Sequence, residues 1–447
     1  MASTYINRAF SSSSASTKAT WSYWLKLNDV TSSNENFVFA TRDANNNNYR
    51  TYFRINNDRS FAVLMYDASG NQLFNKQTSR MFRDPNAWYH VVYRLDTTQG
   101  SADDRLRLYV NNVQETSFTT NTQSSQNATV RTVSSVSTAW GHNAPSGGAY
   151  LNGILSHVHF TEGYSYAPTE FGETDATTGE WKIKTSPSVT YGSNGYFILK
   201  DGNSVTDASP NTNNFTVGAG TLTKTEDCPS NVFCTLNPLS QDISAYASGN
   251  AGVIDIQNGN TFGNKVTHGA YLGTIGVSSG KYYWEVKVGD TNQAIGIVAM
   301  RPTGGVTYLY DDATANLYYP YSDYYYTNGS AGSSGSGDFD NTSNKIYSFA
   351  LDATNNKLWI GRDGTFVGDP ANGTGATWAS LPTGHEWTPV MHSMSTSQNN
   401  YAYFNFGNGY FGTTAVASAG TNASGNGIFE YNVPTGFTAL STKGLNL

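Results

Sequence analysis

The chain has 447 residues and a formal net charge of −7. This length exceeds what one ordinary hydrophobic core organises, so two or three domains are expected. Only 13% of the residues are charged, and no cluster of Lys and Arg is present that could neutralise a nucleic-acid backbone. We therefore expect no nucleic-acid partner.

The composition favours strands over helices. Aromatic residues make up 14% of the chain, so each domain can bury a core, while Asn, Ser, Thr and Gly supply most of the polarity and favour turns and strand edges. The first residues, "MASTYINRAFSSSSAST", lack the apolar core of a signal peptide, and no later run reaches membrane-spanning length. We expect an all-β chain that is made in a cytoplasm and does not insert into a membrane.

Alternating apolar residues, the pattern of half-buried strands, dominate residues 1–165. Residues 49–74 read as three strands separated by turns, and Asn152-Gly153 is a strong hairpin signal. One strand, "WSYWLKL", places four apolar side chains on one face: Trp21, Tyr23, Leu25 and Leu27. Short strands at this spacing predict an antiparallel sandwich.

Residues 166–239 are rich in turn formers and are predicted to form an irregular connector. The two cysteines of the chain, Cys228 and Cys234, lie in it. Their spacing permits a disulfide loop, but two thiols alone cannot make a structural zinc site. Because cytoplasmic synthesis disfavours disulfides, we interpret both as small, semi-buried residues.

Alternation returns in residues 240–447, which predict a second antiparallel sandwich. Its opening strand, "GKYYWEVKV", places four side chains on one face: Tyr282, Trp284, Val286 and Val288. Three low-complexity patches predict flexible loops or arms: "SSSSAST" at 11–17, "NNNN" at 45–48 and "SAGSSGSG" at 330–337.

Residues 308–327 contain eight tyrosines, whose apolar rings and polar hydroxyls suit both a half-buried strand and a binding surface. "VTYLYDD" predicts one strand in which Tyr308 and Tyr310 share a structural face. Pro320 interrupts the remainder, which cannot all be central strand. Its residues suit local loop packing or an exposed patch for a glycan or protein partner: Tyr319, Tyr321, Asp323, Tyr324, Tyr325 and Tyr326.

No assembled catalytic site is recognisable, so we expect a protein that is not an enzyme and needs no cofactor. The nearest acidic set, in "GETDATTGEW", is Glu173, Asp175 and Glu180. A glycosidase would need two carboxylates held rigidly at a fixed separation, and Gly and Thr residues make this segment a turn. We therefore predict no catalytic role for it.

No metal site is predicted either. His157 and His159 alternate on one strand, but they lack a firmly held third ligand, so we interpret them as a polar outward face opposite Ile154, Val158 and Phe160. His90 is interpreted as a hydrogen-bonded sheet residue. Asp103-Asp104 and Asp311-Asp312 could contribute to calcium binding, but neither pair lies in a recognisable calcium loop.

The first region resembles a laminin G-like, concanavalin A-type domain. Four segments carry this resemblance: "WSYWLKL", "DPNAWYHVVYRLD", "LRLYVNNV" and "YLNGILSHVHFTEG". Such domains end a strand with a tight Asn-Gly turn, where this chain has Asn112 in place of Gly. The resemblance implies a jelly-roll sandwich over residues 1–165 but no particular function, because the fold hosts lectins, hydrolases and spacers.

The second region resembles a SPRY domain in "GKYYWEVKV", "AIGIVAM", "YSFALDATNNKLWIGRDGTFVG" and "PVMHSMSTSQNNYAYFNFG". The tail "FEYNVPTGFTALSTKGLNL", together with "NNFTVGAGTLTKTEDCPSNVFCTLNPL", is similar to structural proteins of tailed bacteriophages of the marine and cyanobacterial type. This resemblance implies a virion component that is made in the host cytoplasm, contacts other virion proteins and forms a homo-oligomer, which we expect to be a trimer as in phage fibres.

Three functions remain open at this point. A fibre, tail appendage or capsid decoration would adhere to host-surface glycans through many weakly binding copies. A purely structural cement or connector would use the same aromatic residues against other virion subunits. A polysaccharide-degrading depolymerase would need a pair of facing carboxylates.

Overall fold

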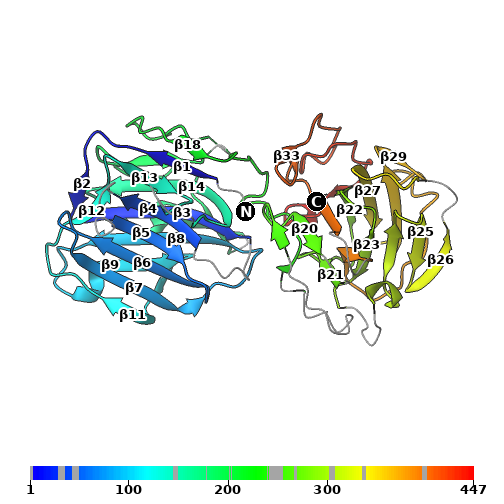
Figure 1. Cartoon of the computed structure of the whole chain (residues 1–447), viewed down its shortest axis with the longest axis horizontal. Helices are drawn as coiled ribbons and strands as arrows, with labels where there is room; N and C mark the ends of the chain where they lie inside the picture. Colours follow the sequence, from blue (N-terminus) through cyan, green and yellow to red (C-terminus); the bar gives the residue numbers. More distant parts are fainter. Residues whose placement is uncertain are drawn as a thin grey trace. The chain divides into compact units, whose positions relative to one another are not determined.

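The computed structural model describes residues 4–28, 36–42, 50–143, 149–177, 179–200, 202, 204–238, 240, 255–265, 269–301, 308–334, 339–394 and 400–446. Across these ranges the chain forms β-strands and short 3₁₀ turns but no α-helix, which confirms the all-β prediction. It divides into two compact units, Met1–Lys224 and Thr225–Leu447, each built from antiparallel sheets (Figure 1).

The first unit has two main sheets. The larger sheet consists of β1 (Tyr5–Arg8), β4 (Asn36–Arg42), β5 (Arg50–Ile55), β6 (Ser60–Tyr66), β7 (Gln72–Met81), β11 (Phe118–Thr122), β13 (Ser137–Trp140) and β18 (Thr216–Ala219). The smaller sheet consists of β3 (Lys18–Leu27), β8 (Trp88–Asp96), β9 (Leu106–Val110), β10 (Val113–Glu115), β14 (Gly153–Glu162) and β17 (Tyr196–Ile198). Their strand orders are β11-β7-β6-β5-β4-β13-β1-β18 and β10-β9-β8-β3-β14-β17.

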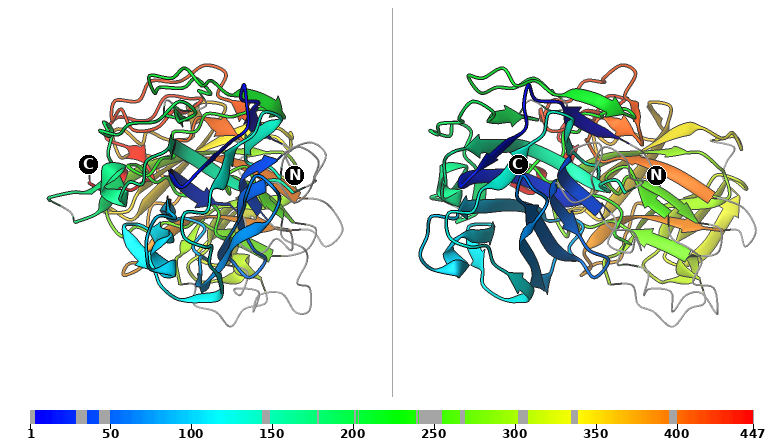
Figure 2. Two further views of the ribbon diagram at one scale, coloured as in Figure 1. Left: turned by 90° about the vertical axis from the view of Figure 1, so that its left-hand side faces the viewer. Right: turned by 60° about the vertical axis from the view of Figure 1, so that its left-hand side comes forward.

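Short elements complete the first unit: β2 (Ser14–Ser16), β12 (Val130–Val133), β15 (Gly172–Thr174), β16 (Trp181–Ile183), η1 (Ala102–Asp104) and η2 (Pro168–Glu170). β2 pairs with β12, and β15 pairs with β16. Figure 2 shows this unit turned toward the viewer.

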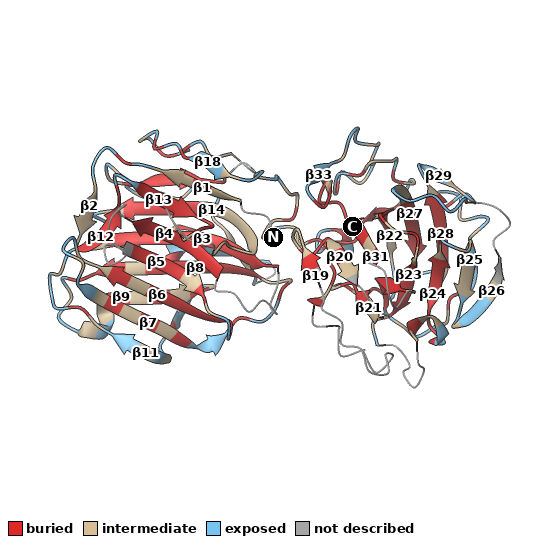
Figure 3. Ribbon diagram, in the orientation of Figure 1, coloured by how far each residue is buried: buried red, intermediate tan, exposed pale blue. Residues whose placement is uncertain are grey.

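One hydrophobic core fills the space between the two main sheets of the first unit. The predicted inward face of β3 is confirmed, because its four alternating apolar side chains all belong to this core: Trp21, Tyr23, Leu25 and Leu27. Opposing rings interlock there, with Phe53 stacked on Tyr93 at a centroid distance of 4.1 Å. Buried strands of this kind appear red in Figure 3.

Residues 166–239 are largely irregular but divide between the two units. The part up to Lys224 adds β17 and β18 to the sheets of the first unit and places Tyr196 in its core, where the hydroxyl accepts a hydrogen bond from Trp140 Nε1 at 2.9 Å. The remainder places Phe233 and Cys234 in the core of the second unit. The structure holds both cysteines as thiols, Cys228 half-buried and Cys234 buried.

The second unit also has two main sheets. The larger consists of β19 (Asp255–Gln257), β20 (Phe262–Lys265), β22 (Lys281–Val288), β27 (Lys345–Asp352), β28 (Lys357–Arg362), β29 (Thr365–Phe366), β31 (Asn400–Asn405) and β34 (Thr438–Ala439). The smaller consists of β21 (Gly269–Leu272), β23 (Gln293–Ala299), β24 (Asn316–Tyr319), β25 (Tyr324–Thr327), β26 (Ser330–Ser334) and β30 (Trp387–Ser393).

The larger sheet has the order β19-β20-β31-β22-β27-β28-β29, with β34 parallel to β22, and the smaller has the order β21-β30-β23-β24-β25-β26. The remaining elements are β32 (Tyr410–Phe411), β33 (Thr414–Ala415), η4 (Leu309–Asp311) and η5 (Gly444–Asn446). The predicted inward face of β22 is confirmed, since the core between the sheets contains its four alternating apolar side chains: Tyr282, Trp284, Val286 and Val288.

Three local predictions are wrong, at least in part. "VTYLYDD" is not one strand, because Leu309–Asp311 forms η4, although the rings of Tyr308 and Tyr310 do stack at 5.0 Å. The low-complexity patch 330–337 is not entirely a loop, because Ser330–Ser334 pairs with β25 as an edge strand. The predicted arm at 11–17 likewise contains β2, which pairs with β12, while residues 45–48 lie outside the described ranges.

Candidate functional site

The tyrosine run forms a hairpin in which alternation sends neighbouring rings to opposite faces of the smaller sheet. In register, Tyr318 pairs with Tyr325, and Tyr319 pairs with Tyr324. Tyr318 is completely buried in the core between the sheets, and the ring of Tyr325 packs against it at 5.0 Å. Tyr319 and Tyr326 instead pack against a second, smaller apolar cluster on the outer face of the same sheet.

Four of the predicted site residues therefore gather on or beside the outer face. Tyr319, Tyr324 and Tyr326 project from β24 and β25, and Tyr321 in the connecting turn lies against Tyr319 at 5.9 Å. We call these four side chains the tyrosine surface. Tyr321 is 51% exposed and Tyr324 is 36% exposed, so both rings present apolar area to solvent.

The other two predicted site residues have structural contacts. Asp323 adopts a left-handed backbone conformation in the turn, with φ of 50°, and its carboxylate accepts a hydrogen bond from the Tyr318 hydroxyl at 3.0 Å. The ring of Tyr325 packs edge-on against Trp378 at 5.7 Å on the core side of the sheet. Neither side chain belongs to the tyrosine surface.

Tyr310, which the sequence predicted to be structural, extends the tyrosine surface. Its ring lies 5.2 Å from that of Tyr326 and 5.4 Å from that of His392 on β30, and the ring of Tyr308 stacks on it. Helix η4 carries Tyr310 over the outer face, which a single extended strand would not have done. The ring of Tyr310 therefore packs against the apolar outer face of β24.

The hydroxyl groups of Tyr310 and Tyr319 stay protonated at neutral pH. Burial raises the pKa of both Tyr310 and Tyr319 to about 12, and nearby tyrosines and acids add to the effect. The Tyr319 hydroxyl donates to Asn292 Oδ1 at 3.2 Å, which fixes its ring on the sheet. The site thus offers tyrosine rings with hydroxyl donors and acceptors.

The acidic candidates of the first unit lie on a short exposed hairpin. Lys182 forms ion pairs with Asp175 at 2.9 Å and with Glu173 at 3.7 Å, so both acids face a lysine between them. Glu180 precedes β16 on the same hairpin. These ion pairs connect β15 to β16, but because they are exposed they stabilise the hairpin only weakly.

The interpretation of the histidine pair as a polar outward face opposite Ile154 is wrong in two respects. A β-bulge at His157, whose φ is 46°, shifts the register of β14, so Ile154 lies on the same outer face as His159 and not opposite to it. His159 is buried there against Phe197 at 3.8 Å, and burial lowers its pKa well below the usual value. Glu162 accepts hydrogen bonds from Thr132 and Asn194.

The interpretation of His90 as a hydrogen-bonded sheet residue is confirmed. Its ring nitrogens bond to the Ser22 hydroxyl at 2.8 Å and to Trp181 Nε1 at 3.0 Å. Within the described residues, no group of three or more His, Cys, Asp or Glu side chains could hold a metal ion. Asp104 pairs with Arg107, and the buried Asp312 accepts two hydrogen bonds from Thr314.

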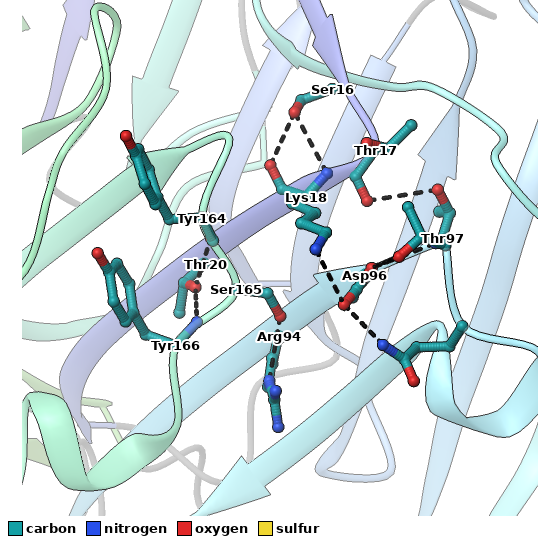
Figure 4. A network of polar contacts seen from close by, with 12 residues as sticks. Ser16, Thr17, Lys18, Thr20, Arg94, Asp96, Thr97, Tyr164, Ser165 and Tyr166 are labelled. Carbon is teal, nitrogen blue, oxygen red and sulfur yellow. Dashed lines mark hydrogen bonds and ion pairs between the residues drawn. The ribbon is translucent and has the colours of Figure 1, made fainter.

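The first part of the predicted connector covers the outer face of the smaller sheet of the first unit. We call residues 163–177 and 179–192 the strap. Thr20 on β3 bonds the backbone of Tyr164 and Tyr166, while Ser165 accepts a hydrogen bond from Arg94 Nε at 3.0 Å (Figure 4). The strap is rich in hydroxyl and aromatic residues, which can make contacts of this kind. Residues that favour turns, however, do not indicate which surface the segment covers.

Sequence reasoning also missed Glu285, a completely buried acid on β22. Its carboxylate accepts hydrogen bonds from the Tyr283 hydroxyl, Asn405 Nδ2 and the backbone N–H groups of Glu430 and Tyr431 at 2.8–3.1 Å. Burial raises its pKa to about 7. Because two of these donors are backbone groups far along the chain, Glu285 fastens the segment at residues 428–431 to the larger sheet.

Comparison with known proteins finds a family model that is similar to the first region. Residues 2–170 match the concanavalin A-like lectin/glucanases superfamily, in its laminin G-like group, which confirms the resemblance proposed for this part of the chain. No curated protein matches the chain. Within the described residues, no helix is long and apolar enough to span a membrane.

Several solved structures are similar at low identity. The SPRY domain of human HERC1 is 18% identical, with 34% of this chain and 91% of that chain covered and a TM-score of 0.26. A protein of Bacteroides ovatus thought to bind carbohydrate is 16% identical, with 50% and 58% covered and a TM-score of 0.33. A heptameric SAP-like pentraxin from Limulus polyphemus is 15% identical, with 37% and 73% covered and a TM-score of 0.26. These likenesses concern the fold alone.

Proposed function

We propose that this chain is a non-enzymatic adhesion protein that binds neutral glycans through the tyrosine surface of its second unit. The observation that carries the proposal is the position of Tyr321 and Tyr324, whose rings are exposed on a hairpin with a buried core side. A rigid support holds aromatic rings in place before a ligand arrives, which lowers the entropic cost of binding.

The chemistry of the surface suits sugars. Tyrosine rings offer flat apolar area to the C–H faces of a pyranose, and their hydroxyls offer hydrogen bonds to its hydroxyl groups. Residues 225–447 contain 8 Lys and Arg but 16 Asp and Glu, a formal charge of −8. Such a field disfavours anionic ligands, so we assign neutral glycans to this surface.

We further propose that the protein acts as part of a phage particle, as a fibre, tail appendage or capsid decoration present in several copies. The support is the resemblance of residues 210–447 to structural proteins of tailed bacteriophages. Many copies would raise the effective strength of weak binding. Locating the chain in intact particles by electron microscopy tests this part, and its absence from such particles would contradict it.

A glycan array tests adhesion directly. We expect the intact protein to retain a neutral glycan and the double variant Tyr321→Ala/Tyr324→Ala to lose it, with an unchanged melting temperature. Tyr164→Ala is the matched control, because Tyr164 in the first unit is 41% exposed. Equal retention by the double variant would overturn the proposal. If no glycan is retained while the tyrosine surface contacts a neighbouring virion subunit, the cement function replaces it.

A further inference from the structure

Two arginines lie directly opposite each other on the outer face of the smaller sheet of the first unit. Arg94 on β8 is in register with Arg107 on β9. The neighbours Leu106 and Leu108 belong to the core, so Arg107 projects to the opposite face, and the register places Arg94 beside it. Like charges at directly opposed positions of an antiparallel pair repel and destabilise the sheet.

The two charges are compensated unequally. Arg107 forms an ion pair with Asp104 at 2.7 Å, and hydrogen bonds to Asp104 and Tyr109 raise its pKa. Among the described residues, Arg94 has one side-chain hydrogen bond, from Nε to Ser165 Oγ, and no carboxylate partner. Ser165 therefore orients the guanidinium group and leaves its two terminal nitrogens available. A guanidinium edge of this kind binds two oxygens of one oxyanion.

The surroundings keep this position reachable. Arg94 and Arg107 are both half-buried, which strengthens a charge interaction without closing the site. In Figure 4, Arg94 extends from Ser165 on the side of the strap away from the rings of Tyr164 and Tyr166. Residues 1–224 contain 18 Lys and Arg and 17 Asp and Glu, a formal charge of +1, so this unit does not repel an anion as the second unit does.

We propose that Arg94, with Arg107 opposite, forms a subsite for an oxyanion carried by a sugar. The ligand class is an acidic glycan, in which a uronic-acid carboxylate or a sulfate ester supplies the two oxygens. Its charge would remove the repulsion between the two arginines as well as bond to Arg94. This subsite is independent of the tyrosine surface and has the opposite charge preference.

Isothermal titration calorimetry of the intact chain tests the subsite with tetragalacturonate, sulfated maltotetraose and maltotetraose. We expect at least one acidic probe to bind at low ionic strength, to bind more weakly in high salt, and to bind far better than maltotetraose. Arg94→Gln should weaken this binding by about tenfold or more, because it removes a charge-assisted bidentate contact. Arg107→Gln should have a smaller effect, because Asp104 already compensates that charge.

Arg83→Gln is the matched control, since Arg83 is an exposed arginine outside the opposed pair. The two acidic probes distinguish a carboxylate ligand from a sulfate ligand. Unchanged binding by Arg94→Gln, equal binding of maltotetraose, or no binding of either acidic probe would overturn the proposal. Tyr321→Ala/Tyr324→Ala should bind the acidic probe like the wild type, so failure here is distinguishable from failure of neutral-glycan adhesion.

Discussion

Trp181 in the strap donates its indole N–H to Nδ1 of His90 at 3.0 Å. Since Nδ1 is an acceptor in this bond, Nε2 carries the proton and donates to the Ser22 hydroxyl at 2.8 Å. The His90 ring also stacks on Trp24 at 4.8 Å. The strap therefore completes the hydrogen bonding of a buried sheet residue and fixes its tautomer.

Trp181→Phe should lower the free energy of unfolding of the first unit by about 1–3 kcal/mol, because a buried acceptor loses its donor. Urea denaturation followed by tryptophan fluorescence measures this. In a His90→Phe background the same substitution should cost less, since no acceptor remains to be satisfied. A coupling energy of zero in this double-mutant cycle would contradict the assigned hydrogen bond.

The pH dependence of the first unit should reflect His90. Burial lowers its pKa from 6.5 to about 3, so the unfolded chain binds a proton more readily than the folded chain does. Stability should therefore fall as the pH drops from about 6.5 toward 3, by up to about 5 kcal/mol from this group. His90→Gln should reduce the pH dependence of thermal unfolding over this range and leave the part that buried His159 contributes, whereas the control His385→Gln in the second unit should not reduce it. An unchanged pH profile in His90→Gln would count against a buried neutral imidazole.

The second unit should show the opposite dependence because of Glu285. Its pKa is raised from 4.5 to about 7, so the folded chain holds the proton more tightly than the unfolded chain. Stability from this group should fall as the pH rises from about 4.5 to 7, by about 3 kcal/mol in total. The protection factors of the backbone N–H groups of Glu430 and Tyr431, which bond to this carboxylate, should consequently fall over that interval after correction for the intrinsic pH dependence of exchange.

Glu285→Gln should remove this pH dependence and also cost about 1–3 kcal/mol, because an amide accepts through one oxygen only. Glu430→Gln is the matched control, since its carboxylate bonds an exposed backbone N–H at Ala417. Protection factors in Glu285→Gln that still fall with rising pH as in the wild type would refute the assignment.

The hairpin of the second unit predicts a sharp contrast between neighbouring tyrosines. Tyr325→Ala should lower stability by about 2 kcal/mol, because its ring packs against Tyr318 and Trp378 on the core side. Tyr321→Ala should change stability by less than about 0.5 kcal/mol, because its ring is exposed. Chemical denaturation of the two variants measures both values. Similar losses of stability would show that the alternation along the hairpin does not separate core tyrosines from surface tyrosines.

The sequence was most informative where apolar residues alternated regularly with polar ones along a strand. Alternation in β3 and β22 predicted which side chains enter each core, because hydrophobic burial acts on every second residue of a strand. It failed at His157, where one extra residue in a bulge changed the face of Ile154. It also failed at Tyr310, because a 3₁₀ turn replaced the expected strand.

Contacts between distant segments were not predictable from the sequence. The pairing of Trp181 with His90 and that of Glu285 with residues 430 and 431 join positions far apart in the chain, and no local pattern records them. The tyrosine run could be recognised as a candidate surface, but only the register of β24 with β25 separates Tyr325 from Tyr324.

The strap and strands β17 and β18 lie largely beyond the segment that matches the lectin-like family, which ends at residue 170. A fragment cut at that limit would lack Tyr196, the acceptor for the indole of Trp140, and would leave the imidazole of His90 open to water. The end of the family match at residue 170 and the end of the first compact unit at Lys224 therefore differ. Recombinant pieces of this protein should extend through Lys224 if they are to be monodisperse.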